Sequence, residues 1–97
     1  MIDKRFDISN FVDVVTESSI VESLVKRVKA RRKESKLSQK ELAVRSAVSY
    51  ASIKRFEQSG EISLSSLVKI ASALDCLTDF NYLFKNKIIS NLKDYKW

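Results

Sequence analysis

The stretch Gln39–Phe56, QKELAVRSAVSYASIKRF, decides the fold of this 97-residue chain. Its apolar residues fall where two short helices joined by a tight turn would bury them, so we expect one inner face made of Leu42, Ala43, Val48, Ile53 and Phe56. On this interpretation apolar residues occur only where the pair must bury them, and the outward positions are basic: Lys40, Arg45, Lys54 and Arg55. The stretch therefore predicts two helices in apolar contact, with positive charge on their outer side.

Serines at expected helix starts divide the chain on either side of this pair. Ser19 begins a capping-box sequence, SIVE, ahead of a helix that should run to about Ser35 with an apolar stripe of Ile20, Val21, Leu24, Val25 and Val28. Ser38 begins a second capping box, SQKE, and Ser49 is the expected cap of the helix after the turn. Gly60 follows that helix, where its freedom at positive φ suits a helix end.

Two further helices are expected after this glycine. Ser63 should cap the first of them, which carries a stripe of Leu64, Leu67, Val68, Ala71 and Leu74. Thr78 should begin the second, a short helix that bears Phe80, Leu83 and Phe84. Sheets usually need glycine and proline for their turns, and the chain has one glycine and no proline, so the fold class is expected to be all-α.

These elements predict a compact five-helix domain over residues 19–84 with an extension at each end. The N-terminal extension, residues 1–18, should form a short helix, because its apolar residues lie partly at helical spacing: Phe6, Ile8, Phe11, Val12 and Val15. The C-terminal tail, residues 85–97, carries Ile88, Leu92 and Tyr95 at positions that would suit a helix face. No linker or internal repeat separates a second domain.

Positive charge is concentrated in the segment that holds the helix pair. The whole chain has a net charge of +6, but residues 1–25 carry a net of −3, residues 26–58 a net of +8 and residues 59–97 a net of +1. A uniformly solvated surface would not be expected to segregate charge in this way. A nucleic-acid footprint would, because phosphates are neutralised by clustered lysine and arginine.

Several classes of function find no support in the composition. The chain has no histidine and a single cysteine, Cys76, so neither an internal disulfide nor a conventional zinc site can form, and no cofactor is expected. Cys76 lies beside Leu74 and Leu77 and is expected to be a small core residue. A glycine-rich phosphate loop and a thiol–base arrangement are both missing, so we expect no enzyme. Without an apolar run long enough for a membrane span or a signal-peptide pattern, a cytoplasmic protein is expected.

The spacing also meets the requirements of a helix-turn-helix. With Gln39 as the first position, the fifth, Ala43, must be small because the helices cross there, and the tenth, fifteenth and eighteenth hold the second helix to the core. With Ser38 ahead, and Glu57 and Gly60 behind, residues 22–80 resemble the Cro/repressor family of bacterial and phage regulators. The resemblance implies a lambda-repressor-like DNA-binding domain. Where the family usually has glycine in the turn, this chain has Ala47, and positive φ at alanine would cost about 1 kcal/mol.

The resemblance also implies which residues bind DNA. The helix after the turn would be the reading helix, so the positions that face the groove are Ser49, Tyr50, Ala51, Lys54 and Arg55. Arg55 could bond a guanine twice, and Tyr50 or Ala51 could pack on a thymine methyl. Gln39 resembles the family's phosphate-binding glutamine, and Lys40 and Ser52 are further phosphate candidates.

Each of these residues has a structural alternative. Lys54 and Arg55 could be solvated charges, and the ring of Tyr50 could lie over its own helix. The basic run before the pair surrounds more than half of a helix, so it cannot all face one duplex: Lys26, Arg27, Lys29, Arg31, Arg32, Lys33 and Lys36. Among these, Arg31, Arg32 or Lys33 near the helix end could touch phosphates.

The function expected from these features is a sequence-specific DNA-binding regulator, a repressor that binds a palindromic operator as a homodimer. Its dimer surface would be the short helix expected from Thr78 together with the tail, residues 85–97, or the N-terminal 18 residues. Three segments resemble the small regulators encoded beside Hip-type kinase toxins, which implies an antitoxin with a kinase-type toxin as partner: Arg55-Phe56-Glu57, Glu61-Ile62-Ser63-Leu64 and Asp79-Phe80 with Leu83-Phe84. The alternative is a protein-interaction module that keeps the fold without binding DNA. Membrane binding is not expected, because the core needs the apolar stripe of the basic helix.

Overall fold

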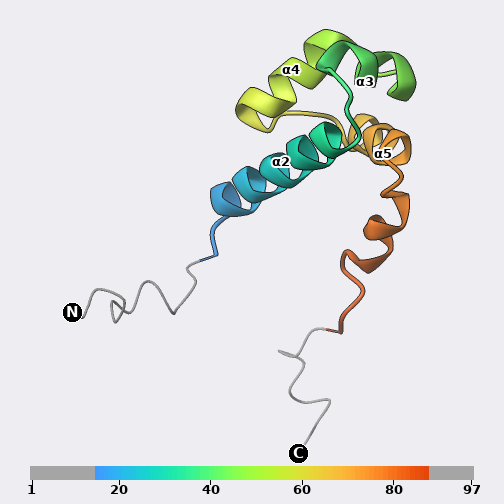
Figure 1. Ribbon diagram of the computed structural model, residues 1–97. Coiled ribbons are helices and arrows are strands. Elements are labelled where there is room, and N and C mark those ends of the chain that lie inside the picture. The colour runs from blue at the N-terminus through green and yellow to red at the C-terminus, as the bar shows by residue number, and fades with distance from the viewer. Residues whose placement is uncertain (1–14, 88–97) are drawn as a thin grey trace, which may run out of the picture.

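A computed structural model describes residues 15–87, and the regular structure in that range is entirely helical (Figure 1). It comprises four α-helices and one 3-10 helix: α2 (Glu17–Glu34), α3 (Gln39–Ser46), α4 (Tyr50–Ser59), α5 (Leu64–Ala73) and the 3-10 helix η2 (Leu77–Tyr82). The predicted all-α fold class is confirmed. The short helix expected within residues 1–18 and the face expected at Ile88, Leu92 and Tyr95 fall mainly or wholly outside the described residues.

The three serine caps around the helix pair are confirmed. The Oγ atoms of Ser38, Ser49 and Ser63 each accept a hydrogen bond from the backbone N–H three residues on, at 3.0, 3.0 and 3.1 Å. At Ser38 the capping box is complete, because the Glu41 carboxylate accepts the Ser38 backbone N–H at 2.7 Å. These local bonds satisfy amides that have no partner inside their helices.

The expected cap at Ser19 is wrong. Helix α2 begins at Glu17 with Thr16 as its N-cap: the Thr16 Oγ1 atom accepts the Ser19 N–H at 3.0 Å. The Ser19 hydroxyl occupies the position that Glu or Gln takes in the common capping box, and it accepts the Thr16 N–H at 2.9 Å. Two hydroxyl residues three positions apart therefore complete a reciprocal cap one turn earlier than expected.

Left-handed residues end the two helices of the pair. Ala47 has φ 62° and ends α3, so the departure from glycine noted above does place an alanine at positive φ. Gly60 has φ 83° and ends α4 as predicted. A Cβ atom at Gly60 would also overlap the Val21 side chain of α2, so the glycine is required for the close approach of the α4 end to α2.

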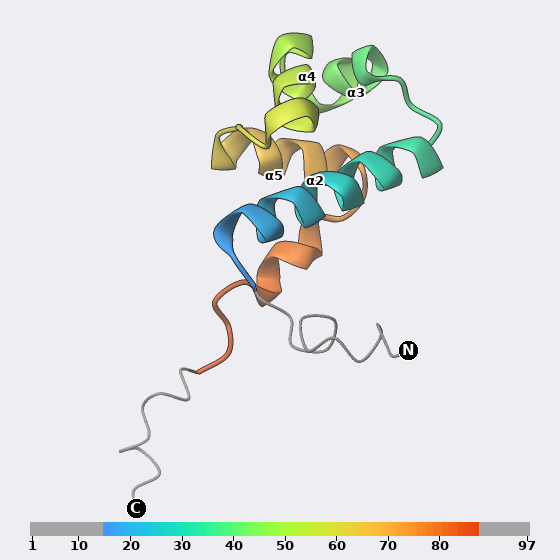
Figure 2. The same ribbon diagram turned by 90° about the vertical axis from the view of Figure 1, so that its left-hand side faces the viewer.

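The core lies between the helix pair and the layer of α2 and α5. In both Figure 1 and Figure 2, α3 and α4 form one layer and α2 and α5 lie beneath it. Leu42, Ile53 and Ile70 are almost completely buried, and they are joined by Leu37, Val48, Phe56, Ala71 and Leu74. Of the predicted inner face only Ala43 is half-buried. Cys76 is half-buried and packs against this core, as expected.

Several apolar residues lie outside the core. Val44 in α3 is 83% exposed, so the interpretation that apolar residues of the pair occur only where they are buried is wrong. Leu64, expected in a buried stripe, is 69% exposed because it is the first residue of α5. The last helix is a six-residue 3-10 helix that contains Thr78 but begins at Leu77, and Leu83 and Phe84 follow it in exposed positions. No helix in residues 15–87 is long and apolar enough to cross a membrane.

Candidate nucleic-acid interface

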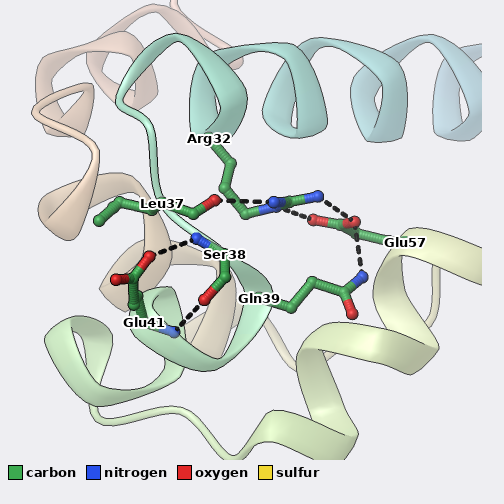
Figure 3. Close-up of polar contacts among 6 residues, drawn as sticks. All are labelled: Arg32, Leu37, Ser38, Gln39, Glu41 and Glu57. Carbon is green, nitrogen blue, oxygen red and sulfur yellow. Dashed lines mark hydrogen bonds and ion pairs between the residues drawn. The ribbon is translucent and has the colours of Figure 1, made fainter.

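A buried ion pair joins α2 to the end of α4. The Arg32 guanidinium donates from Nε to Glu57 Oε2 at 2.7 Å and from Nη2 to Glu57 Oε1 at 3.0 Å, and its Nη1 donates to the Leu37 carbonyl at 2.8 Å (Figure 3). The two side chains are only 9% and 3% exposed. Arg32 is therefore a structural residue and not one of the phosphate contacts considered for the basic run.

The sequence carried a signal for this role that the basic run obscured. Ile20, Leu24 and Val28 lie four residues apart on the apolar stripe of α2, and the next position in that series is Arg32. A charge on the buried face of a helix needs a buried partner, because an unpaired one would be strongly destabilising. The partner, Glu57, directly follows the buried Phe56.

The same carboxylate fixes the side chain of Gln39. Its Nε2 atom donates to Glu57 Oε1 at 2.8 Å, so the first residue of α3 is tied to the end of α4 (Figure 3). An amide nitrogen carries two hydrogens, and the second remains available to a phosphate. Glu57 and Arg32 would thus position Gln39 for the phosphate contact predicted from the sequence, and the bonds among these three side chains join α2, α3 and α4.

The environment of Glu57 favours its ionised form. Burial of this carboxyl would raise its pKa, but the hydrogen bonds from Arg32 and Gln39 and the positive charges of Arg32 and Lys29 outweigh burial, so the pKa lies below its ordinary value. The pKa of Glu41 is also lowered, by the hydrogen bonds from the Ser38 backbone and hydroxyl and by the charge of Arg45, which outweigh a small effect of burial. Both carboxylates remain charged at neutral pH.

Tyr50 stands between two lysines on the outer face of the helix pair. Lys54, one turn further along α4, places its Nζ atom 5.2 Å from the centre of the ring, and Lys40 of α3 places its Nζ atom at 5.4 Å. The Tyr50 side chain is thus neither buried nor isolated. The residue is 38% exposed, and both ammonium groups lie close enough to interact with the face of its ring. This arrangement gathers two positive charges around an aromatic ring at the start of the predicted reading helix.

Arg55 lies on the side of α4 that faces the start of α5. Its side chain is 71% exposed, and its Nε atom is 4.0 Å from Glu61 Oε1, at the outer limit of an ion pair. Arg55 lines an open polar hollow together with Ala51, Ser52 and residues of the α5 start. A loosely held, exposed guanidinium of this kind is free to turn toward a base edge or a phosphate.

The start of α5 is a feature that the residue-by-residue assignment missed. Ser63 caps this helix, and Ser63 and Ser66 line the same hollow as Arg55. Unpaired first-turn amides and the positive end of a helix attract anions, so this terminus can add a phosphate contact beside Arg55. The signal was present in the sequence, because Ser63 was recognised as a cap, but only the fold shows that it neighbours α4.

The remaining predicted site residues lie at the N-cap and first turn of α4. Ser49 and Ala51 are exposed and Ser52 is half-buried. The Ser49 hydroxyl donates to the Ser52 Oγ atom at 2.8 Å, so the two hydroxyls form a small polar cluster at the first turn of α4. The structure thus brings together, on or between α3 and α4, the eight residues assigned from the sequence: Gln39, Lys40, Ser49, Tyr50, Ala51, Ser52, Lys54 and Arg55.

Comparison with known families agrees with this architecture. A model for a helix-turn-helix family matches residues 28–81, which include all of α3, α4 and α5 and more than half of the chain. No curated protein and no solved structure matches the chain. The protein belongs to this helix-turn-helix family, which is a family of DNA-binding transcriptional regulators related to the Cro/repressor group. The Cro/repressor resemblance inferred from Gln39–Phe56 is thereby supported.

Proposed function

We propose that this protein is a sequence-specific, dimeric repressor that binds the DNA upstream of its own gene. The observation that carries the proposal is the exposed surface of α4, where Tyr50 lies between Lys54 and Lys40 of α3 and where Arg55 is exposed on the side that faces the start of α5. A short helix with basic and aromatic side chains on its free side suits insertion into the major groove.

Phosphate contacts and base contacts have different sources in this proposal. The start of α3, with Gln39 and Lys40, and the start of α5, near Ser63, present N–H groups and positive charge on either side of α4. These contacts would set the orientation of the domain on the duplex without reading sequence. Arg55 would then read guanine through paired hydrogen bonds, and Tyr50 or Ala51 would meet thymine methyl groups.

A dimer is proposed because one module of this size makes too few base contacts for selective binding. Proteins of this class commonly place two reading helices about one turn of DNA apart, which accounts for the palindromic operator that we expect. Exposed apolar residues outside the pair are available for such an interface, among them Tyr82 at 71% and Phe84 at 102% exposure.

An antitoxin role is the narrower form of the proposal. Its support is the sequence resemblance of residues 55–57, 61–64 and 79–84 to the regulators encoded beside Hip-type kinase toxins. In that case the protein would act in the cytoplasm, bind a kinase-type toxin and repress the operon that encodes both. The test is co-expression with the neighbouring gene product. Formation of a complex and relief of growth arrest would support the antitoxin role, and the absence of both would contradict it.

The alternative, an interaction module that does not bind DNA, accounts less well for the charges. A surface that binds only protein would not need the net charge of +8 over residues 26–58 or the exposed lysines around Tyr50. Electrostatic attraction to phosphates makes direct use of both.

A fluorescence-anisotropy titration separates the two functions. The protein is titrated against the duplex upstream of its own gene and against a random duplex of equal length, at several salt concentrations. Tight binding to the upstream duplex alone, which weakens as salt rises, is the expected result. Equally weak binding to both duplexes, or none, would contradict the proposed repressor and favour the interaction module.

A further inference from the structure

An apolar groove lies on the side of the domain remote from the helix pair. The groove has a volume of about 360 Å³ and is lined by Ile20 and Leu24 of α2, Leu67 of α5, Phe80 of η2 and the adjacent Leu83. In Figures 1 and 2 η2 lies on the side of α5 away from α3 and α4. Ile20 and Leu83 are 53% and 56% exposed, so this apolar surface is incompletely covered by residues 15–87.

The polar rim of the groove is mainly basic. Arg27 and Arg31 of α2 line it, and among residues 15–87 Asp79 is the one acidic residue in the lining. Arg27 is held by Ser23, whose Oγ atom accepts from Nη1 at 2.6 Å, and Arg31 pairs at 3.7 Å with the exposed Glu34. Neither arginine has a buried acidic partner among the described contacts. The groove therefore favours an occupant that is apolar and carries negative charge.

We propose that residues 6–14 of this same chain, FDISNFVDV, occupy the groove. The segment carries Asp7 and Asp13 and no lysine or arginine, and its other residues include two phenylalanines, an isoleucine and two valines. It ends directly before Val15 and the α2 cap, so a reversal of the chain there brings it alongside Ile20. Nine residues span about 30 Å when extended, more than the ~16 Å from Ile20 to Arg31 along the helix.

Two other occupants fit the charges less well. Residues 88–97 contain Lys93 and Lys96 against Asp94, a net positive charge beside a basic rim. A second copy related by a two-fold axis would present the same surface, so Arg27 and Arg31 of both copies would face each other. Residues 6–14 and the groove residues Ile20 and Leu24 also lie outside the part of the chain that matches the family, residues 28–81. Residues 6–14 would thus be an addition of this chain to the shared domain, whereas most of the residues that line the groove lie inside it, from Val28 to Phe80.

The single cysteine provides a probe of the groove. Cys76 is half-buried, lines the groove and carries a free thiol that contacts the Leu74 carbonyl at 3.3 Å. Its rate of reaction with an aromatic disulfide reagent depends on access, because the reagent must reach the sulfur. A segment that covers the groove will slow this reaction, and a change that releases the segment will accelerate it.

The test compares Phe11→Ser with Tyr95→Ser in the full chain. We expect Phe11→Ser to raise the rate at Cys76 by about threefold or more, because the thiol becomes accessible, and Tyr95→Ser to leave it unchanged. An unchanged rate in Phe11→Ser, an equal rise in Tyr95→Ser, or a rate in the unaltered chain that rises on dilution would each overturn the proposal. The last two results would indicate residues 88–97 or a second copy as the occupant.

Two controls separate release of the segment from loss of stability. Ile53→Val loosens the core away from the groove, and a rate increase as large as that of Phe11→Ser would show that general opening exposes the thiol. Arg27→Gln should raise the rate, whereas Lys26→Gln, with the same charge change outside the groove, should not. Arg27→Gln should add nothing to Phe11→Ser, because the interaction it removes is already lost; additive effects would contradict the proposal.

Discussion

At the scale of single residues, Arg32 stabilises the fold through its buried ion pair with Glu57 and not through its charge alone. Replacing Arg32 by alanine leaves the Glu57 carboxylate buried without its partner, and the Leu37 carbonyl loses a donor. We expect Arg32→Ala to lower the free energy of unfolding by about 3–5 kcal/mol in a urea titration. Lys33→Ala, which removes an exposed basic side chain of the same helix, should change it by less than about 0.5 kcal/mol. Equal effects would show that Arg32 has no structural role.

The lowered pKa values of Glu57 and Glu41 predict acid sensitivity. Each carboxyl has a lower pKa in the folded chain than its ordinary value of 4.5. The stabilisation from its ionised form is therefore complete above pH 4.5 and is lost as the pH falls through the lower pKa of the folded chain. The free energy of unfolding, measured by urea titration from pH 7 to pH 3, should therefore fall below about pH 5. The Glu57→Gln variant should have a lower free energy of unfolding at pH 7, and this free energy should fall less toward pH 3. A wild-type stability that rises toward pH 3 would contradict this assignment.

In the proposed function, Arg55 is the residue on which recognition of the DNA sequence would depend most. Arg55→Ala would remove the proposed paired hydrogen bonds to guanine, so specific binding should weaken by about 1–3 kcal/mol, while binding to random duplex changes little. Lys26→Ala, which removes a similar charge from α2, is the matched control and should spare the specific component. Anisotropy titrations measure both affinities. If Arg55→Ala weakens specific and random binding equally, Arg55 contacts phosphate and does not read bases.

At the scale of the elements, the turn between α3 and α4 carries a measurable strain at Ala47. Its φ of 62° is a conformation that glycine adopts without penalty. Ala47→Gly should therefore raise the free energy of unfolding by about 0.5–1 kcal/mol, while Ala30→Gly inside α2 should lower it by about 1 kcal/mol. Thermal or urea unfolding of the two variants checks that their changes in the free energy of unfolding have opposite signs. A destabilised Ala47→Gly variant would show that the turn is not strained.

The features that could be predicted well from the sequence were those that depend on neighbouring residues, above all the helix caps. Ser38, Ser49 and Ser63 cap helices because each hydroxyl bonds an amide three residues away, and such a bond depends on little beyond the local chain. The α2 start was misplaced because Thr16 and Ser19 form a cap from two hydroxyls. Helical periodicity did carry the signal that Val44 is exposed, because two residues along a helix it lies about 200° from the buried Leu42, and the interpretation of the pair overlooked it.

Links between distant residues were the part of the candidate site that local patterns could not predict. Arg32 and Glu57 are 25 positions apart, and only packing of α2 against α4 brings them together. The neighbourhood of Arg55 and the α5 start likewise depends on how α5 crosses beneath the pair. The outward residues of α4, in contrast, were predicted from the spacing of its buried ones and from the resemblance to the Cro/repressor family.

At the scale of the whole molecule, two surfaces of different chemistry occupy opposite sides of the domain. The basic and aromatic face lies on α3 and α4, and the apolar groove is lined by residues of α2, α5 and η2. Figure 2 shows α3 and α4 at one side of the domain and η2 at the other. The buried pair of Arg32 and Glu57 lies between α2 and the helix pair and holds the two layers together. Because the surfaces are separate, occupation of the groove need not interfere with DNA.

The central claim is that α4, flanked by the starts of α3 and α5, is the DNA-binding face. The most direct test is a titration of isotopically labelled protein with the upstream duplex, followed through the backbone amide resonances. We expect the largest shifts at residues 49–55, with further shifts at the first turns of α3 and α5 and small ones at Ile20, Leu24 and Phe80 of the groove. Shifts centred on the groove, with residues 49–55 unaffected, would contradict the account.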